Sequence, residues 1–517
     1  MKSSRIKRIT FILLFFPVIL FSQQVKIVTN HIGYENIGAK RSIVVSESKS
    51  ALSDFQLVDA NTGKVVFSGK PIFNGKVEQW KNWIFYTIDF TSFVTEGSYR
   101  LQVNTDGKPV SSYPFTIEKN VLEKATLSDV IYYFKGQRSS GLLDKADHHL
   151  KIAGNDTVID AHGGWYDATG DYGKHLSHLS FSSYFNPQQI PLTAWSLFKS
   201  CELLSKKSGT DFRQFNRRLL DEAMYGADYL VRMKVKNGSF YRSVASPGLG
   251  KLPEDRVIQA EEKSYRIKAS KDQAFNNNRS STDWRKYQVS YRSGGGIAIA
   301  ALALASGYPV SGDFSQADYL KAAENAFAFL EKNNPAMTND GKENVIDDYC
   351  ALSAATELYK VTLKTVYQQA AEKRAKQLLK RLISAGKYKN YWRADDGDRP
   401  FFHPSDAGFP LVSLLYYYPL ASETMKAEIK KAVKLSMEYE LSVTREVNNP
   451  FGYSRQLVQD TLGKRHTSFF FPHGSDASPW WQGENARLSS MATAARMAAK
   501  LFVDDRTFHA ELENFST

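Results

Sequence analysis

The feature that most constrains the fold of this chain is a change in its hydrophobic periodicity near Val121. Before that residue, short runs such as RSIVV, WIFYTIDF and SYRLQV are rich in β-branched and aromatic residues, and turn signals such as Asn61-Thr62-Gly63 separate them. After it, longer segments such as GGGIAIAALALAS and YCALSAATELYKVT carry apolar residues at helical spacing. The 517-residue chain therefore predicts a small β domain followed by a larger helical domain.

Each of the two regions favours a particular architecture. About seven short strands within residues 23–118 predict an all-β sandwich of immunoglobulin type, without the cysteine pair of antibody domains. Residues 119–510 hold about a dozen helical segments with Ala and Gly on one face, which predicts an all-α barrel of helical hairpins, an (α/α) barrel. An α-solenoid is the structural alternative, but no fixed repeat period runs through these segments.

Residues 1–22 predict a signal peptide. Basic residues between Lys2 and Arg8 form its start, residues 9–21 are almost wholly apolar, and Ser22 is a small residue suited to cleavage. The apolar run is too short for a comfortable membrane span, so a retained anchor is the less favoured alternative. We therefore expect an exported mature chain, periplasmic or extracellular, without a membrane span.

Charge and cysteine content restrict the partners of the chain. The formal net charge is +13, but the basic residues are scattered and match no nucleic-acid-binding motif, so no nucleic-acid partner is expected. A basic surface suits either solubility alone or an acidic polymer. The two cysteines, Cys201 and Cys350, lie within apolar helical patterns, which predicts buried free thiols instead of a disulfide or a metal pair. We expect a monomer.

The first stretch with candidate chemistry is HGGWYDATGDYGKHLSHLS, residues 162–180. Trp165 and Tyr166 offer flat apolar faces, and Asp167 and Asp171 bracket a short loop. Sugar hydrolysis needs such a combination, because aromatic rings stack on the pyranose face while a carboxylate polarises a water molecule. Asp171 also precedes a helical pattern, so a turn with an N-cap is the alternative interpretation.

The second stretch is FFFPHGSDASPWWQGENARLSSMATAARM, residues 469–497. Trp480 and Trp481 precede Glu484, which opens a strong helical pattern. A Glu in a first helical turn commonly interacts with the helix dipole. Partial desolvation beside two tryptophans would instead help a carboxyl group to hold a proton near neutral pH. This stretch alone leaves both interpretations open.

Together these stretches resemble glycoside hydrolase family 9, in the subgroup with an N-terminal immunoglobulin-like domain before the catalytic barrel. NHIGYENIGAKRSIVV and FTSFVTEGSYRLQV resemble the start and end of that β domain. GGWYDATGDYGKHLSH, YRSGGGIAIAALALAS, HPSDAGFPLVSLLYY, NNPFGYSRQ and WWQGENARL then follow in the family's order, so the likeness covers almost the whole mature chain. The resemblance implies a six-hairpin (α/α) barrel and an enzyme that cleaves β-glycosidic bonds of polysaccharides or oligosaccharides with inversion.

The resemblance also implies roles for the three carboxylates. Asp171 would be the general base that takes a proton from the attacking water, Asp167 would hold that water, and Glu484 would be the general acid. Inversion requires the acid and the base to lie about 6.5–9.5 Å apart, so that the water fits between base and sugar. The sequence departs from the family in two places: the spacing between the aspartates is one residue longer, and Pro472-His473-Gly474 replaces a Pro-His-His-Arg stretch.

Further residues are candidates for substrate contact, each with a packing or capping role as its alternative. Four are aromatic residues whose rings would stack on sugars: Trp165, Tyr166, Trp480 and Trp481. Five others lie just before helices or near the acid: Tyr291, Arg292, His403, Asp406 and His473. No cluster has zinc-type spacing, so no metal ligands are predicted. No cofactor is required, and the resemblance implies at most a structural Ca²⁺ ion.

These observations predict an exported inverting β-glycoside hydrolase that acts on β-glucan, in particular a β-1,4-glucanase. An exo-β-glucosaminidase-like hydrolase on the same scaffold is the nearest alternative, and it would need an acidic pocket residue for the ammonium group of its substrate. A polysaccharide lyase would suit the basic charge but not the three carboxylates. A non-catalytic glycan-binding protein is a third alternative, and retention of all three carboxylates speaks against it.

Overall fold

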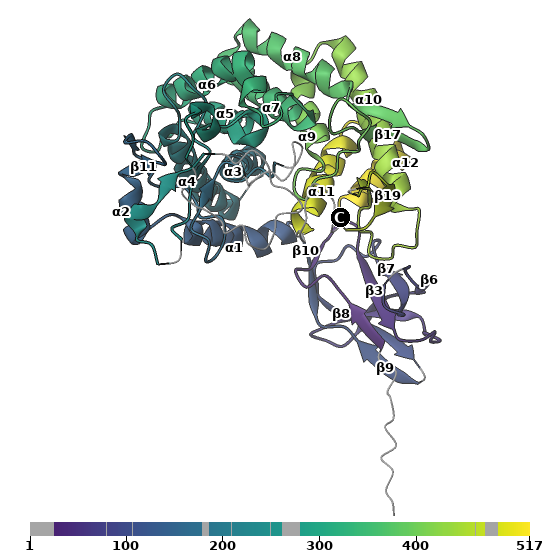
Figure 1. Ribbon diagram of the computed structural model, residues 1–517. Coiled ribbons are helices and arrows are strands. Elements are labelled where there is room, and N and C mark those ends of the chain that lie inside the picture. Colours follow the sequence, from purple (N-terminus) through teal and green to yellow (C-terminus); the bar gives the residue numbers. More distant parts are fainter. Residues whose placement is uncertain are drawn as a thin grey trace, which may run out of the picture. The chain divides into compact units, whose positions relative to one another are not determined.

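The computed structural model describes residues 25–517 with gaps at 79, 106, 178–185, 208, 249, 261–279, 461 and 471–483. The chain forms two compact units, Met1–Lys119 and Asn120–Thr517, each with its own hydrophobic core (Figure 1). The division lies beside the expected junction between residues 118 and 119. The expected signal peptide, residues 1–22, falls outside the described residues. No helix in the described part of the chain is long and apolar enough to span a bilayer.

The first unit consists of two β-sheets. One has the strand order β1-β3-β7-β6, with β1 Val25–Val28, β3 Arg41–Ser46, β7 Ile84–Asp89 and β6 Ile72–Gly75. The other has the order β2-β10-β8-β4-β5, with β9 on β8; its strands are β2 Tyr34–Glu35, β10 Phe115–Glu118, β8 Gly97–Thr105, β4 Phe55–Asp59, β5 Val65–Gly69 and β9 Lys108–Ser111.

Alternating burial explains why these strands form a sandwich. Along β8, Leu101 and Val103 are buried, whereas Arg100 on the opposite face is exposed. Successive side chains of a strand point to opposite faces of its sheet, so the buried set lines one face. Leu101 shares a core with Val44 and Ile88 of the other sheet. The predicted immunoglobulin-like β-sandwich is confirmed.

The second unit is mainly helical. Its helices are α1 Val121–Gln137, α2 Gly141–Asp147, α3 Ile190–Leu204, α4 Thr210–Arg232, α5 Gly296–Ser306, α6 Gln316–Met337, α7 Val345–Thr362, α8 Thr365–Leu379, α9 Phe409–Tyr417, α10 Glu423–Thr444, α11 Asn485–Ala499 and α12 Arg506–Phe515. The short helical turns are η1 Pro253–Asp255, η2 Trp284–Tyr287, η3 Tyr291–Gly295 and η4 Tyr418–Leu420. The last helix extends beyond residue 510, where the sequence pattern had placed the end of the barrel.

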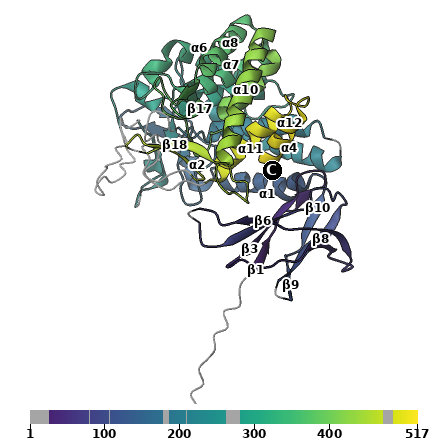
Figure 2. The same ribbon diagram turned by 90° about the vertical axis from the view of Figure 1, so that its right-hand side faces the viewer.

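An inner row of helices forms the centre of this unit. The helix α3 packs against α5, α5 against α7, α7 against α9, and α9 against α11. Each of them also packs against the helix that follows it in the sequence, which completes a hairpin. Every residue from Gly296 to Ala305 of α5 is buried, as expected of a helix that is apolar all round. Figures 1 and 2 both draw α11 near α1, so the row curves back toward its beginning, and the predicted barrel of hairpins is confirmed.

Short strands lie between the helices of the second unit. Five of them form one sheet in the order β12-β11-β15-β14-β13, with β11 Leu150–Ile152, β12 Val158–Ile159, β13 Lys174–His175, β14 Ser243–Val244 and β15 Val257–Ile258. Two further pairs are β16 Leu382–Ala385 with β17 Tyr388–Trp392, and β18 Gln456–Gln459 with β19 Arg465–Ser468. The cysteines of α3 and α7, Cys201 and Cys350, are buried and free, as predicted.

Candidate active site

The two aspartates of the first motif lie on opposite arms of a tight turn. Ala168 and Asp171 form an antiparallel bridge, in which the amide of Asp171 donates to the carbonyl of Ala168 at 3.0 Å. Asp167 lies on the arm that enters the turn, and its amide donates to the carbonyl of Gly173 at 2.8 Å. The longer spacing between the aspartates thus forms a compact turn. The strand β13 follows this turn, so the prediction that Asp171 precedes a helix is wrong.

The carboxylates of this turn have different surroundings. Asp171 is exposed, and its Oδ1 accepts a hydrogen bond from the amide of Gly173 at 3.0 Å. Asp167 is half-buried, and its Oδ1 accepts a hydrogen bond from Nε2 of Gln189 at the start of α3. A residue that accepts a proton from water must lie within hydrogen-bond reach of that water, whereas a residue that only orients the water benefits from a fixed position. This arrangement suits Asp171 for the former role and Asp167 for the latter.

Glycines bring the chain to this turn along a path that side chains would block. Gly163 and Gly164 have φ values of +78° and +76°, in the left-handed region that favours glycine. A Cβ atom on Gly164 would lie 2.8 Å from the ring of Tyr229, which is fully buried in α4. The backbone therefore passes directly over α4 just before Trp165.

Trp165 belongs to the core beneath the site. It is 3% exposed, and its Nε1 donates to Oε1 of Glu222 at 2.8 Å. Arg138, which follows α1, binds both oxygens of Glu222 and lies over the ring of Tyr225. Trp165 thus packs within the core, and it also contributes to the lining of the small cavity beside Asp167. Its predicted contact with a sugar stays a prediction.

A buried charge cluster holds the same segment from the other side. Nζ of Lys174 donates to the carbonyls of Ala161 and Gly163 at 2.6 and 2.7 Å, and it pairs with Asp147 at 2.7 Å. Arg256 also pairs with Asp147 and donates to the carbonyl of Tyr172. Burial lowers the pKa of Lys174 to about 8, although the charge of Asp147 opposes this effect. We call Asp147, Lys174 and Arg256 the anchoring cluster, because it fixes both ends of the aspartate turn.

A small cavity opens beside Asp167. Its volume is about 220 Å³, below the roughly 300–1,000 Å³ of typical small-molecule pockets, so it would hold only a small part of a polymer. Aromatic and amide side chains dominate its lining, which consists of Tyr133, Phe134, Gln137, Trp165, Tyr166, Asp167, His175, Gln188, Gln189, Ile190 and Thr193. Tyr166 is half-buried here and packs edge-on against Tyr172. Of the two aromatic candidates in the described part of the chain, Trp165 and Tyr166, both line the cavity, and Tyr166 has the more open ring.

The third carboxylate lies at the beginning of α11. Glu484 is the N-cap residue of this helix, and its Oε2 pairs with Nε of Arg487 at 2.5 Å. Arg487 is 1% exposed and also donates to the carbonyls of Ser454 and Phe469. The side chain of Glu484 is 12% exposed, so it is largely enclosed. His473, Trp480 and Trp481 lie outside the described residues.

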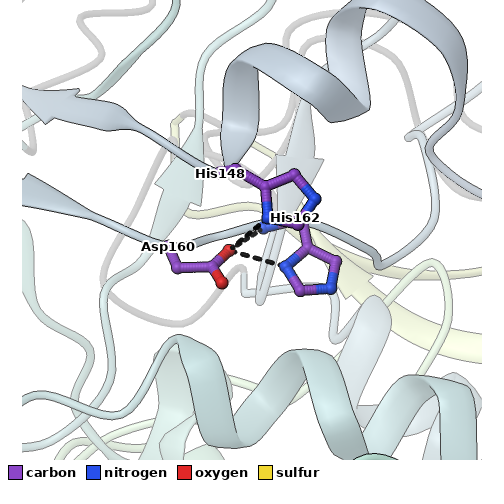
Figure 3. Close-up of side chains that lie close together, drawn as sticks. All are labelled: His148, Asp160 and His162. Carbon is purple, nitrogen blue, oxygen red and sulfur yellow. Dashed lines mark hydrogen bonds and ion pairs between the residues drawn. The ribbon is translucent and has the colours of Figure 1, made fainter.

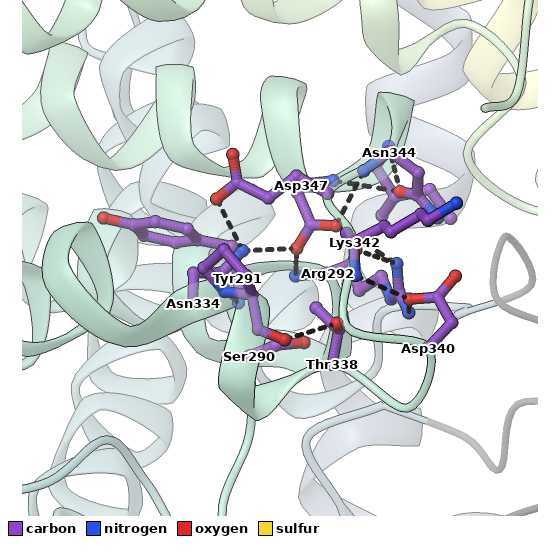
Figure 4. Close-up of polar contacts among 12 residues, drawn as sticks. Ser290, Tyr291, Arg292, Asn334, Thr338, Asp340, Lys342, Asn344 and Asp347 are labelled. Atoms are coloured by element: carbon purple, nitrogen blue, oxygen red, sulfur yellow. Dashed lines mark hydrogen bonds and ion pairs between the residues drawn. The ribbon is translucent and has the colours of Figure 1, made fainter. Parts of the chain in front are cut away.

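Two further candidates, Tyr291 and Arg292, are bonded within the protein. Both are buried in η3, and the hydroxyl of Tyr291 donates to Glu331. Arg292 pairs with Asp347 at 3.3 Å and with Asp340 at 2.8 Å (Figure 4). These bonds favour the packing alternative for both residues, and their contact with substrate stays a prediction. Their position directly before α5 explains why the sequence pattern predicted a contact with substrate.

His403 and Asp406 are likewise buried. Nδ1 of His403 accepts hydrogen bonds from the amides of Ser405 and Asp406, and Asp406 accepts one from the hydroxyl of Tyr349. Burial lowers the pKa of His403, which favours the neutral ring that accepts these bonds. Both residues shape the turn before α9 and have no exposed surface for a substrate.

Sequence reasoning missed the residues that support the site. Glu222, Gln189 and the anchoring cluster were not candidates, because they come from segments with ordinary helical or loop patterns. One signal was present in the sequence: Glu222 lies within the apolar face of α4, and such a buried charge needs a partner. The partners themselves, Arg138 and Trp165, are far away in the sequence and could be found only from the fold.

The structure thus has an immunoglobulin-like unit and a barrel of helical hairpins, with paired aspartates beside an aromatic cavity. Comparison with known families is more specific. The family model for glycosyl hydrolase family 9 matches residues 124–403, and that for the cellulase N-terminal immunoglobulin-like domain matches residues 22–108. The chain belongs to glycosyl hydrolase family 9. The matched segment includes Asp167 and Asp171 and ends before Glu484.

Individual relatives agree with this assignment. A xyloglucan-specific endo-β-1,4-glucanase of Bacteroides ovatus is 27% identical over 376 residues, which is 68% of this chain and 60% of that protein. The chain thus spans less than two thirds of that relative. A family 9 structure from Bacteroides ovatus has a TM-score of 0.57 at 20% identity, and a metagenome-derived family 9 endoglucanase has 0.58 at 19%. Each alignment covers 95% of this chain and 83% of the other, which shows a shared fold.

Proposed function

We propose that this protein is an inverting β-glycoside hydrolase that cleaves β-1,4-linked glucan chains. The observation that carries the proposal is the rigid turn of Asp167 and Asp171 beside an aromatic cavity, in a chain of glycosyl hydrolase family 9. The similar Bacteroides ovatus protein is a xyloglucan-specific endo-β-1,4-glucanase, which makes xyloglucan the first substrate to test.

In the proposed mechanism, Asp171 removes a proton from a water molecule that attacks the anomeric carbon. Its exposed position leaves room for that water, and Gln189 fixes the neighbouring Asp167, which would accept the second water proton as a hydrogen bond. Single displacement requires the water and the leaving oxygen to lie on opposite faces of the sugar. In this mechanism Asp171 accepts a proton and Glu484 donates one, so the proposed reaction needs no cofactor.

Glu484 would donate a proton to the leaving glycosidic oxygen. A hydrogen bond from Nε of Arg487 to its Oε2 orients the carboxyl group at the beginning of α11. An exported protein that digests a polymer also agrees with the signal peptide expected from residues 1–22.

The test compares wild-type protein with neutral variants on xyloglucan, β-1,4-glucan and mixed-linkage β-glucan. Asp171→Asn and Glu484→Gln should each lower the release of reducing ends by about 100-fold or more, because general acid–base catalysis contributes about 10²–10⁴-fold. Asp156→Asn is the matched control, since Asp156 is exposed in a loop away from the aspartate turn and the substitution removes the same charge.

The stereochemistry of the first product separates this proposal from its alternatives. Proton NMR should show the α-anomer first from a β-linked substrate. An initial β-anomer would contradict the inverting mechanism, and an ultraviolet-absorbing unsaturated product would indicate a lyase. Full activity of Asp171→Asn would refute the role of Asp171 even if the protein hydrolyses glucan.

A further inference from the structure

Two histidines and an aspartate, His148, Asp160 and His162, converge at the surface of the helical unit. Oδ1 of Asp160 lies 2.6 Å from Nδ1 of His162 and 3.6 Å from Nδ1 of His148 (Figure 3). One ligand atom from each residue lies within 4.8 Å of the others. The side chains are 45%, 48% and 24% exposed for His148, Asp160 and His162, so water reaches the group.

The backbone holds these three residues in place. Pairing of Leu150 with Ile159 between β11 and β12 brings the end of α2 next to the residues that follow β12. The amide of Ala161 donates to the carbonyl of Asp147 at 2.8 Å, and this bond joins the residues next to His148 and Asp160 in the sequence. The amide of His162 donates to Oδ1 of Asp160 and closes a turn. Little main-chain movement is therefore needed to present all three donors at once.

The donor set has the chemistry of a transition-metal site. Two imidazole nitrogens and one carboxylate oxygen are typical zinc ligands at about 2.0–2.2 Å, and an open site completes its coordination with water. Donor pairs around such an ion lie roughly 3–3.5 Å apart, between the two distances measured here, so small side-chain rotations suffice. Rotation is needed because the two imidazole rings are now stacked at 3.9 Å. Calcium is a poor candidate, since it prefers six to eight oxygen ligands.

We propose that His148, Asp160 and His162 form a surface site for a divalent transition-metal ion, with Zn²⁺ as the ion of choice. The bound ion replaces the hydrogen bond between His162 and Asp160 by coordination bonds and ties the end of α2 to the segment after β12. His162 directly precedes Gly163, where the path to the aspartate turn begins, so the ion stabilises that segment. The proposal does not depend on the glycosidase activity.

Zinc binding to the purified, chelator-treated protein is the direct test, with ZnCl₂ alone as the probe. Isothermal titration should give one zinc ion per chain with a dissociation constant near or below about 10 µM. Thermal unfolding should move upward by a few degrees as zinc is added, because a ligand that binds only the folded state stabilises it. EDTA should reverse the shift.

Neighbouring histidines provide a matched control. His148→Ala, His162→Ala and Asp160→Asn should each weaken zinc binding by at least about tenfold. His149→Ala should leave it unchanged, because His149 is adjacent and exposed but outside the cluster. Circular dichroism of the zinc-free variants verifies folding, and Asp160→Asn keeps the test decisive if a histidine variant unfolds.

Absence of zinc binding to the wild-type protein at about 100 µM would overturn the proposal. Equal loss in His149→Ala and His148→Ala would also overturn it, since this would indicate general adhesion of zinc to surface histidines. Activity on glucan is not part of this readout, so failure of the zinc site and failure of the proposed glycosidase function are distinguishable.

Discussion

Gly164 and Gly170 adopt the same unusual backbone conformation in very different surroundings. Their φ values are +76° and +87°, so an alanine at either position would be strained. A Cβ atom on Gly164 would lie 2.8 Å from the buried ring of Tyr229, whereas one on Gly170 would have no atom within 4 Å. The pair therefore separates backbone strain from steric overlap at the aspartate turn.

We predict that Gly170→Ala lowers the free energy of unfolding by about 1 kcal/mol, from strain alone. Gly164→Ala should lower the free energy of unfolding by about 1–3 kcal/mol more than Gly170→Ala does, because the buried ring of Tyr229 is fixed by its neighbours. Urea unfolding of both variants followed by tryptophan fluorescence would measure the difference. Equal costs would mean that the segment shifts away from α4 without penalty.

The residues of the site were only partly predictable from the sequence. The spacing of Asp167 and Asp171 around a glycine turn was visible, because local turn chemistry depends on neighbouring residues. Whether Trp165 or Arg292 faces a ligand was not visible, since this depends on partners such as Glu222 and Asp347 from distant helices. An exposed aromatic or charged side chain can contact a ligand, whereas a buried one packs or pairs within the protein. Only the fold reveals which side chains are buried.

At the level of elements, a buried ion pair joins two inner helices. Nζ of Lys199 in α3 lies 2.7 Å from Oε1 of Glu357 in α7, and their side chains are 4% and 1% exposed. Burial alone would lower the pKa of Lys199, but the charges of Glu357 and Glu202 outweigh it and raise the pKa above the ordinary lysine value. Lys199 therefore remains charged inside the barrel.

Replacing one residue of the Lys199–Glu357 pair should lower the stability more than replacing both. We predict that Lys199→Met lowers the stability by about 3 kcal/mol, because the buried Glu357 then loses its nearer partner and keeps the pair with Lys360 at 3.4 Å. Adding Glu357→Leu should recover most of that loss, since two apolar side chains can replace a buried pair. Denaturant unfolding of the single and double variants measures the coupling.

An ion pair at the surface provides the control for this set of single and double variants. Lys426 and Glu423 pair at 2.8 Å on α10, where the glutamate is 89% exposed. Lys426→Met should change the stability by less than about 0.5 kcal/mol, because exposed pairs contribute little. A similar cost for Lys199→Met would show that water reaches the interior pair.

Most elements could be predicted from the sequence because their patterns are strong over many residues. The apolar α5 and the alternating β8 are such cases. The two-residue strand β13 could not be predicted, because its pairing with β14 involves residues far away in the chain. The helical pattern read after Asp171 begins with β13 in the structure, so apolar spacing over a few residues was a weak signal there.

For the whole molecule, the two hydrophobic cores share no residue. The core of the first unit extends from Ile27 to Ile117, and that of the second from Ile131 to Leu512. Hydrophobic stabilisation is proportional to the apolar area that each core removes from water. A substitution that leaves a cavity in one core should therefore lower the stability of its own unit only.

Leu101→Ala tests this independence. Leu101 is fully buried in β8, and its truncation should lower the stability of the first unit by about 2–5 kcal/mol. Hydrogen-exchange mass spectrometry should then show faster exchange within residues 25–119 and unchanged exchange within 120–517. Leu302→Ala, at a fully buried position of α5, should give the reverse pattern. Faster exchange in both units after either substitution would mean that they unfold as one cooperative body, because a loss in one core would then reach every amide of the chain.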